Sequence, residues 1–214
     1  MEPVFASVFL RTLLIGLAVA MPVGAMAVLC VERTLQDGWR SGVATGLGIA
    51  TADGAYAAVA AFGITAVSAL LVAWQVPLRV AGGLALLALG IRALLRPTPA
   101  AARDHVGSGA TISSSYVTLY ASAFALTLTN PMTIIAFAAV FMSAGLAGIE
   151  GTASALAATA GVAAGSLCWW LALCTVVASV RRGMTGTTAA WLGRASGFVI
   201  AGFGLAAVLS AFFV

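Results

Sequence analysis

Long apolar runs recur along the whole chain, and they limit its possible folds more than any other feature. A helix needs about 20 residues to cross a hydrocarbon core of roughly 30 Å. Six stretches of the 214-residue sequence are close to that length or exceed it, and they cover residues 5–31, 41–62, 78–95, 116–143, 153–180 and 191–213. The sequence therefore predicts an all-α integral membrane protein with six transmembrane helices.

Composition supports this fold class and excludes several functions. Hydrophobic residues make up 62% of the chain and charged residues 7%, with a mean hydropathy of +1.11, whereas about a quarter of a soluble domain is charged. A soluble enzyme is therefore excluded. The apolar stretches contain no histidine and no base beside their serines, so we expect no enzymatic activity, no cofactor and no resident metal.

The arginines predict the orientation in the membrane, because positive residues accumulate on the cytoplasmic side. Eight lie in or beside the loops after helices one, three and five, namely Arg33, Arg40, Arg92, Arg96, Arg103, Arg181, Arg182 and Arg194. Only Arg11 and Arg79 lie on the opposite side. We therefore expect an inner-membrane protein with both termini outside, whose first apolar run stays as a helix. Arginines at helix ends do not indicate a nucleic-acid partner.

Prolines and glycines recur at a similar offset in the two halves of the chain. The pairs are 109 to 115 residues apart and comprise Pro22 with Pro131, Gly46 with Gly161, and Gly83 with Gly197. Two repeats of three helices must enter the membrane from opposite sides. We predict a first three-helix repeat over residues 1–95, a cytoplasmic linker over 96–115 and an inverted second repeat over 116–214. Stripes of small residues, which let helices approach closely, are compatible with a homodimer.

Asp53 is the only acidic residue deep inside a predicted span. Placing a carboxylate there costs about 2.5 to 3.5 kcal/mol on insertion scales, so such an acid normally faces a polar cavity on an ion or substrate path. It can also exchange protons near neutral pH, as a proton-coupled carrier requires. The alternative is a structural acid paired with an arginine or a backbone donor. Cys168 occupies the matching place in the second half.

Pro22 and Pro131 predict breaks in helices one and four. A proline cannot donate to the carbonyl four residues earlier, so the carbonyls of Ala18 and Thr127 are expected to be free. Gly24 and Asn130, beside the prolines, loosen each helix further. Irregular backbone at membrane depth is tolerated where it lines a cavity, and paired breaks surround the substrate in repeat-built carriers. A simple packing kink is the alternative.

The residues around both prolines and Asp53 resemble the LysE-type amino-acid exporters. In the first half the resemblance rests on Met21-Pro22-Val23-Gly24-Ala25, Val28-Leu29-Cys30, Arg33-Thr34-Leu35, Gly38, Gly42, Gly46-Leu47-Gly48, Ala52-Asp53 and Tyr56. In the second half it rests on Thr129-Asn130-Pro131. The sequence departs from the family pattern at Ala25, where a second proline is usual, and at Met132, where a lysine is frequent.

This resemblance implies a six-helix exporter that moves basic or neutral amino acids, or in one branch cadmium, out of the cytoplasm with an ion gradient. We therefore interpret the chain as a secondary active exporter of amino acids or related small metabolites. It is expected to couple export to protons and to work by alternating access. Asp53 would bind both the proton and the amine of the substrate. The other expected substrate ligands are Asn130, Pro22, Pro131, Gly24, Thr51 and Thr127.

Two other functions remain open. A heavy-metal exporter would require clustered soft or carboxylate ligands, and the sequence offers one intramembrane acid and scattered cysteines. A membrane thiol-redox carrier would require two cysteines that converge from symmetric helices. Cys30 and Cys168 do not occupy matching positions, and Cys168 and Cys174 do not share a helix face, so no such pair is expected. Trp169 and Trp170 are interpreted as packing or lipid-facing residues.

Overall fold

The computed structural model describes residues 2–22, 24–62, 74–95, 115–130, 133, 136–137, 151–183 and 186–212. This part of the chain forms seven helices and no strand. They are α1 (Glu2–Ala20), α2 (Ala25–Asp37), α3 (Trp39–Ala61), α5 (Gln75–Leu95), α7 (Tyr116–Thr129), α9 (Thr152–Arg182) and α10 (Gly186–Ser210). The described part is therefore all-α, in agreement with the sequence analysis.

The first predicted span is broken at its proline. The helix over Phe5–Ala20 and the helix over Ala25–Asp37 are bent by 79° relative to each other. Pro22 lies between them, and Gly24 caps α2 with extended backbone at φ −124° and ψ −171°. The break predicted in helix one is confirmed. The predicted end at residue 31 is wrong, because α2 continues to Asp37, so Arg33 belongs to a helix and not to a loop.

Four helices of the described residues are long and apolar enough to cross a membrane, namely Trp39–Ala61, Val76–Leu95, Thr152–Arg181 and Trp191–Ser210. The bent pair of α1 and α2 qualifies as one further span. The helix α7 is apolar but has 14 residues. It ends two residues before Pro131, which lies outside the described residues, as do much of the predicted span 116–143 and most of the predicted linker 96–115.

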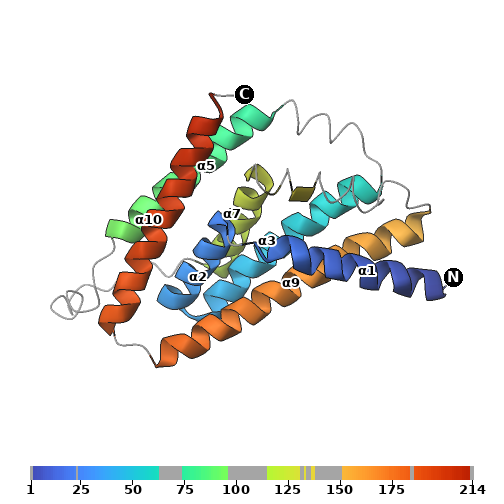
Figure 1. The fold of residues 1–214 in the computed structure, drawn as a ribbon, viewed down its shortest axis with the longest axis horizontal. Helices are drawn as coiled ribbons and strands as arrows, with labels where there is room; N and C mark the ends of the chain where they lie inside the picture. Colours follow the sequence, from blue (N-terminus) through green and yellow to red (C-terminus); the bar gives the residue numbers. More distant parts are fainter. Residues whose placement is uncertain are drawn as a thin grey trace.

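The helices α5 and α10 lie side by side as an antiparallel pair, and α9 runs along both α1 and α3 (Figure 1). Glycines set the close approach of α5 to α10. A Cβ atom at Gly83 would lie 2.8 Å from the carbonyl oxygen of Gly204, and one at Gly90 would lie 2.6 Å from that of Gly197. The two backbones therefore touch over about two helical turns, which is the packing that small residues permit in membranes.

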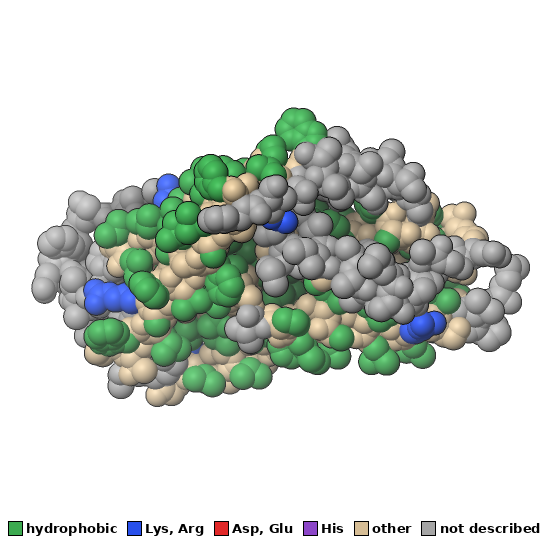
Figure 2. Space-filling view, turned by 45° about the horizontal axis from the view of Figure 1, so that its top comes forward, with side chains coloured by type: hydrophobic (Ala, Val, Ile, Leu, Met, Phe, Trp, Pro, Cys, Tyr) green, Lys and Arg blue, Asp and Glu red, His purple; other side chains and the backbone are tan. Residues whose placement is uncertain are grey.

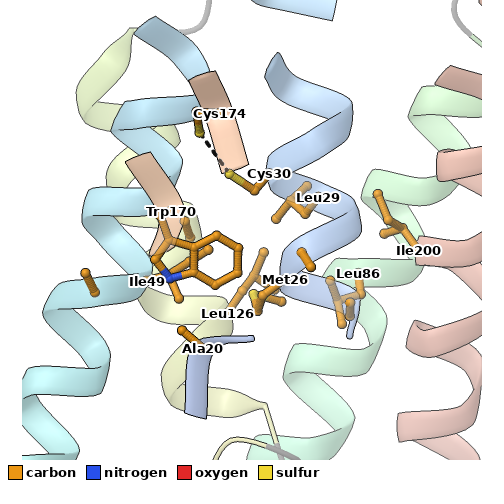
Figure 3. Close-up of a cluster of buried hydrophobic side chains, with 14 residues drawn as sticks. Ala20, Met26, Leu29, Cys30, Ile49, Leu86, Leu126, Trp170, Cys174 and Ile200 are labelled. Atoms are coloured by element: carbon orange, nitrogen blue, oxygen red, sulfur yellow. Dashed lines mark hydrogen bonds between the residues drawn. The ribbon is translucent and has the colours of Figure 1, made fainter. Parts of the chain in front are cut away.

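Large apolar side chains cover the outer faces of the helices. Figure 2 shows a face on which hydrophobic side chains predominate and arginines are few. Phe198 on α10 is 72% exposed and Val117 on α7 is also 72% exposed, a distribution suited to lipid contact. Inside the bundle, a buried cluster that includes Leu29, Ile49 and Trp170 surrounds α2 (Figure 3). The short helix α2 thus lies at the centre of the packing.

Candidate functional site

A cavity of about 530 Å³ lies at the break between α1 and α2. Its volume is within the range of small-molecule sites, which is roughly 300 to 1,000 Å³. The lining comes from the break and from α1, α2, α3, α5, α9, α10 and the residues after α7. It includes Ala20, Pro22, Gly24, Ala25, Met26, Ala27, Asp53, Leu86, Asn130, Thr133, Trp170, Phe203 and Ser210.

The cavity brings together four of the seven residues that the sequence singled out. Pro22 and Gly24 form its wall at the helix break, Asp53 reaches it from α3, and Asn130 reaches it from the end of α7. These residues are up to 108 positions apart in the chain. Their convergence follows from the packing of α3 against both α2 and α7.

Two of the other predicted ligands, Thr51 and Thr127, do not line this cavity. Thr51 is exposed, donates its hydroxyl to the carbonyl of Leu47 at 2.8 Å, and borders a separate hollow between α3 and α9. Thr127 is 1% exposed and donates to the carbonyl of Ala123 at 2.8 Å. Pro131 lies outside the described residues.

Asp53 is held by a chain of hydrogen bonds from α9. Its side chain is 4% exposed, and the hydroxyl of Ser166 donates to Oδ2 at 2.6 Å. The indole Nε1 of Trp170 in turn donates to Ser166 Oγ at 3.0 Å. Ser166 and Trp170 are four residues apart and therefore share a helix face. Glycines allow the close approach of α3 to α9, because Gly46 packs on Trp170 and Gly54 packs on Ala163.

The sequence alone gives no sign that Ser166 and Trp170 form this hydrogen-bonded chain with Asp53. Ser166 stands among small residues of an apolar helix and carries no signal that separates it from packing serines. Trp170, interpreted as a packing or lipid-facing residue, is 3% exposed and lines the cavity. Cys168, which occupies the position matching Asp53 in the second half, is exposed.

The backbone is irregular where Asn130 meets the cavity. Asn130 follows the last residue of α7 with extended φ and ψ of −77° and 114°. Its N–H donates to the carbonyl of Thr127 at 3.2 Å, so the expectation that this carbonyl is free is wrong. The last turn of α7 is tightened by this hydrogen bond between residues three positions apart, as helix ends often are. Tyr56 of α3 anchors the same turn by donating to the carbonyl of Leu128 at 2.7 Å.

Arg33 is also buried, although the sequence placed it in or beside a loop. It is 6% exposed. Its Nη1 donates to Thr45 Oγ1 at 3.2 Å and to the carbonyl of Leu119 at 3.0 Å, and its Nη2 donates to Ser122 Oγ at 2.9 Å. One guanidinium thus joins α2 to α3 and α7. Its five N–H donors suit such a junction between helices.

Two cysteines also converge, contrary to the prediction. The sulfur atoms of Cys30 on α2 and Cys174 on α9 are 3.4 Å apart in the bundle interior. The prediction excluded the pair of Cys30 with Cys168 and the pair of Cys168 with Cys174. It did not consider the pair of Cys30 with Cys174. Among the described residues, no group of three or more histidine, cysteine, aspartate or glutamate side chains is arranged to hold a metal ion.

Comparison with known proteins gives one match. A family model described as LysE type translocator matches residues 17–211. This range contains the helix break, Asp53, Asn130 and every helix except most of α1. No curated protein and no solved structure matches the chain.

Proposed function

The chain belongs to the LysE type translocator family, and from this premise we propose that it exports amino acids or related small metabolites through the cavity at the α1–α2 break. The family consists of membrane transporters and not of enzymes. One observation carries the proposal, which is that Asp53 is buried within the candidate span Trp39–Ala61 and borders a cavity of about 530 Å³. An intramembrane acid in such a place is typical of a substrate or ion path.

Two parts of the cavity lining match the two charged groups of an amino acid. The carboxylate of Asp53 offers a partner for an ammonium group. The first turn of α2, with Ala25, Met26 and Ala27, borders the same space. Its N–H groups have no acceptor within the helix and form the positive end of the helix dipole, which favours a carboxylate. Broken helices bind substrate carboxylates in this way in other carriers.

Apolar side chains line much of the remaining cavity. Met26, Leu86 and Phe203 contribute to its wall, whereas Asn130 supplies an amide. An apolar substrate side chain would bury against these groups without losing hydrogen bonds to water. We therefore favour a small or medium-sized neutral amino acid as the substrate.

Proton coupling follows from competition for one carboxylate. When Asp53 is ionised it attracts the substrate ammonium, and when it is protonated that attraction is lost. A proton that enters from outside would thus displace the substrate, and release of the proton inside would restore the binding state. The hydroxyl of Ser166, 2.6 Å from Asp53, keeps the carboxyl oriented in both states.

Alternating access requires two parts that move against each other. Leu86, Phe203 and Ser210 bring the α5–α10 pair to one wall of the cavity, and the helices around α3 form the other. The continuous backbone contact between α5 and α10 supports their movement as one unit. In the predicted orientation, with both termini outside the inner membrane, rocking of this pair would expose the cavity to each side in turn.

Helix contacts support the inverted repeats over 1–95 and 116–214. Gly83 and Gly197 are 114 residues apart, and so are Gly90 and Gly204. Gly83 meets Gly204 and Gly90 meets Gly197, so exchange of equivalent positions reproduces the interface, as a two-fold axis requires. The contacts of α1 with α9 and of α3 with α7 exchange in the same manner.

A transport assay tests the proposal directly. The purified chain would be reconstituted into liposomes with an imposed pH gradient and offered labelled neutral and basic amino acids, simple amines, carboxylic acids and divalent metal ions. We expect gradient-driven movement of a neutral amino acid, with less movement of the amine or acid that lacks the second charged group. Movement of metal ions without movement of amino acids would contradict it.

A further inference from the structure

The thiol pair of Cys30 and Cys174 has no part in the proposed transport cycle. Cys30 is 0% exposed and Cys174 is 1% exposed, and their sulfur atoms are 3.4 Å apart (Figure 3). Both cysteines are free. Thr34 Oγ1 lies 3.6 Å from the sulfur of Cys174, and the carbonyl oxygen of Gly42 lies 3.6 Å from that of Cys30. Of these contacts of the two sulfur atoms, the shortest is the one that they make with each other.

The position of the pair relates it to the cavity. Cys30 lies one helical turn after Met26, and Cys174 lies one turn after Trp170, and both of these neighbours line the cavity. Beyond the cysteines, α2 and α9 continue to Asp37 and Arg182, next to the loops that the arginines assign to the cytoplasm. The thiol pair therefore lies between the cavity and the side that is predicted to be cytoplasmic.

We propose that Cys30 and Cys174 are a modification site, at which a reversible disulfide joins α2 to α9 and stops transport. A disulfide bond is about 2.05 Å long, so the sulfurs must approach by about 1.4 Å, which rotation of the side chains can supply. The bond would link residues 144 positions apart, from the two halves of the chain. Its effect on transport rests on the proposed function, whereas the formation of the bond does not.

The oxidant must be small, because the two thiols are buried and a larger disulfide reagent could not reach them. Hydrogen peroxide is an oxidant of that size. One thiol sulfur attacks peroxide, so that an S–O bond forms, the O–O bond breaks and one water leaves. The second sulfur then attacks the sulfenic sulfur, so that the S–S bond forms and the S–O bond breaks. The second water leaves. Both thiols are oxidised, one peroxide is reduced, and a dithiol reductant reverses the reaction.

A covalent bond between α2 and α9 would act on the cavity because both helices contribute to its wall. Substrate entry from the cytoplasm requires separation of the helices that cover the cavity on that side. In the observed arrangement the thiols are in contact, so the disulfide would hold α2 and α9 together on this side. The reduced pair imposes no such covalent limit.

Thiol labelling tests the bond without reference to transport. The full chain in liposomes would be treated with hydrogen peroxide, unfolded, labelled with N-ethylmaleimide and weighed by mass spectrometry. We expect one label after peroxide and three after a dithiol reductant, with a cross-linked peptide that contains Cys30 and Cys174. In Cys168→Ser, labelling should fall from two to none. Three labels after peroxide, a cross-link through Cys168 or terminal oxidation to sulfinic acid would overturn the proposal.

Transport measurements then test the effect of the bond. Export by the wild-type chain should be lost after peroxide and return after reduction, while Cys30→Ser and Cys174→Ala should be insensitive to peroxide. Full export by the cross-linked protein would overturn the blocking role. Absence of transport in the reduced protein would count against the proposed function, and the mass measurement would still decide on the disulfide.

Discussion

Asp53 can be tested by removing its charge while keeping its shape. Asp53→Asn fixes the neutral state, so pH-driven export should be lost, because neither the proton nor the substrate ammonium can use the carboxylate. Exchange of labelled for unlabelled substrate should also be lost if Asp53 binds the amine. Exchange should persist if Asp53 carries protons alone. Both are measured in the liposome assay, and Asp53→Glu should retain some activity with a changed pH optimum.

The matched control for this variant is Asp37→Asn, which removes an acid at the end of α2, away from the cavity. It should transport like the wild type. Normal gradient-driven export by Asp53→Asn would exclude Asp53 from the mechanism.

Ser166 acts on the substrate site through Asp53, and its loss should change the pH profile of export. Ser166→Ala removes the donor that lies 2.6 Å from the carboxylate, which alters the balance between the ionised and protonated states. Thr159→Val on the same helix is the control, because its hydroxyl donates only to its own helix at Ala155. An unchanged pH profile together with reduced protein yield would indicate a purely structural role for Ser166.

Asn130 should matter for binding more than for folding. Asn130→Ala is expected to raise the substrate concentration that gives half-maximal export, because an amide on the cavity wall is replaced by a methyl group. Membrane yield and thermal unfolding in detergent should stay close to those of the wild type. Equal losses of yield and transport would favour the alternative that this position only shapes the end of α7.

The sequence singled out unusual residues that line the cavity, but it did not identify their hydrogen-bond partners. A carboxyl in an apolar helix is visible in the sequence because burial without a purpose is costly. The partner that satisfies Asp53 is an ordinary serine 113 residues later, and only the packing of α3 on α9 identifies it. The burial of Arg33 and the contact of Cys30 with Cys174 were missed for the same reason. Thr51 and Thr127 were also singled out, and in the structure their hydroxyls bond to their own helices.

At the scale of helices, local chemistry predicted the break and packing determined the ends. The missing N–H of Pro22 is a local property, and the helix does break there. The extension of α2 to Asp37 is not local, because Arg33 and Thr34 are stabilised by contacts with α3, α7 and α9. Hydropathy alone predicted the end of this helix too early, at residue 31.

The α5–α10 contact should be sensitive to a single methyl group. In Gly204→Ala the new Cβ would lie 2.6 Å from the carbonyl oxygen of Gly83 and 2.5 Å from the backbone nitrogen of Leu87. Overpacking of this kind costs about 1 to 3 kcal/mol, so thermal unfolding in detergent should occur at a lower temperature. Gly202→Ala is the control on the same helix, because its Cβ would meet no described atom within 4 Å. Equal stability of the two variants would contradict the close packing.

At the scale of the whole molecule, the arginine distribution predicts which side each segment faces. A tag after Val214 should react with an impermeant label on intact cells, and a tag within the linker 96–115 should react only after the membrane is opened. Labelling efficiency of the two tags in intact and opened cells measures this. Protection of the C-terminal tag would reverse the predicted orientation and, with it, the direction of transport drawn from the cavity.

The hydrogen bonds of this bundle also define an order of assembly during synthesis. Several threonines donate to the carbonyl four residues earlier, namely Thr12, Thr34, Thr45, Thr51, Thr127, Thr129, Thr159 and Thr175. Each of these helices can enter the bilayer with those hydroxyls already satisfied, before any neighbour arrives. Asp53 differs, because its partner Ser166 leaves the ribosome 113 residues later. The nascent first half therefore inserts before the hydrogen-bond partner of Asp53 in the second half has been made.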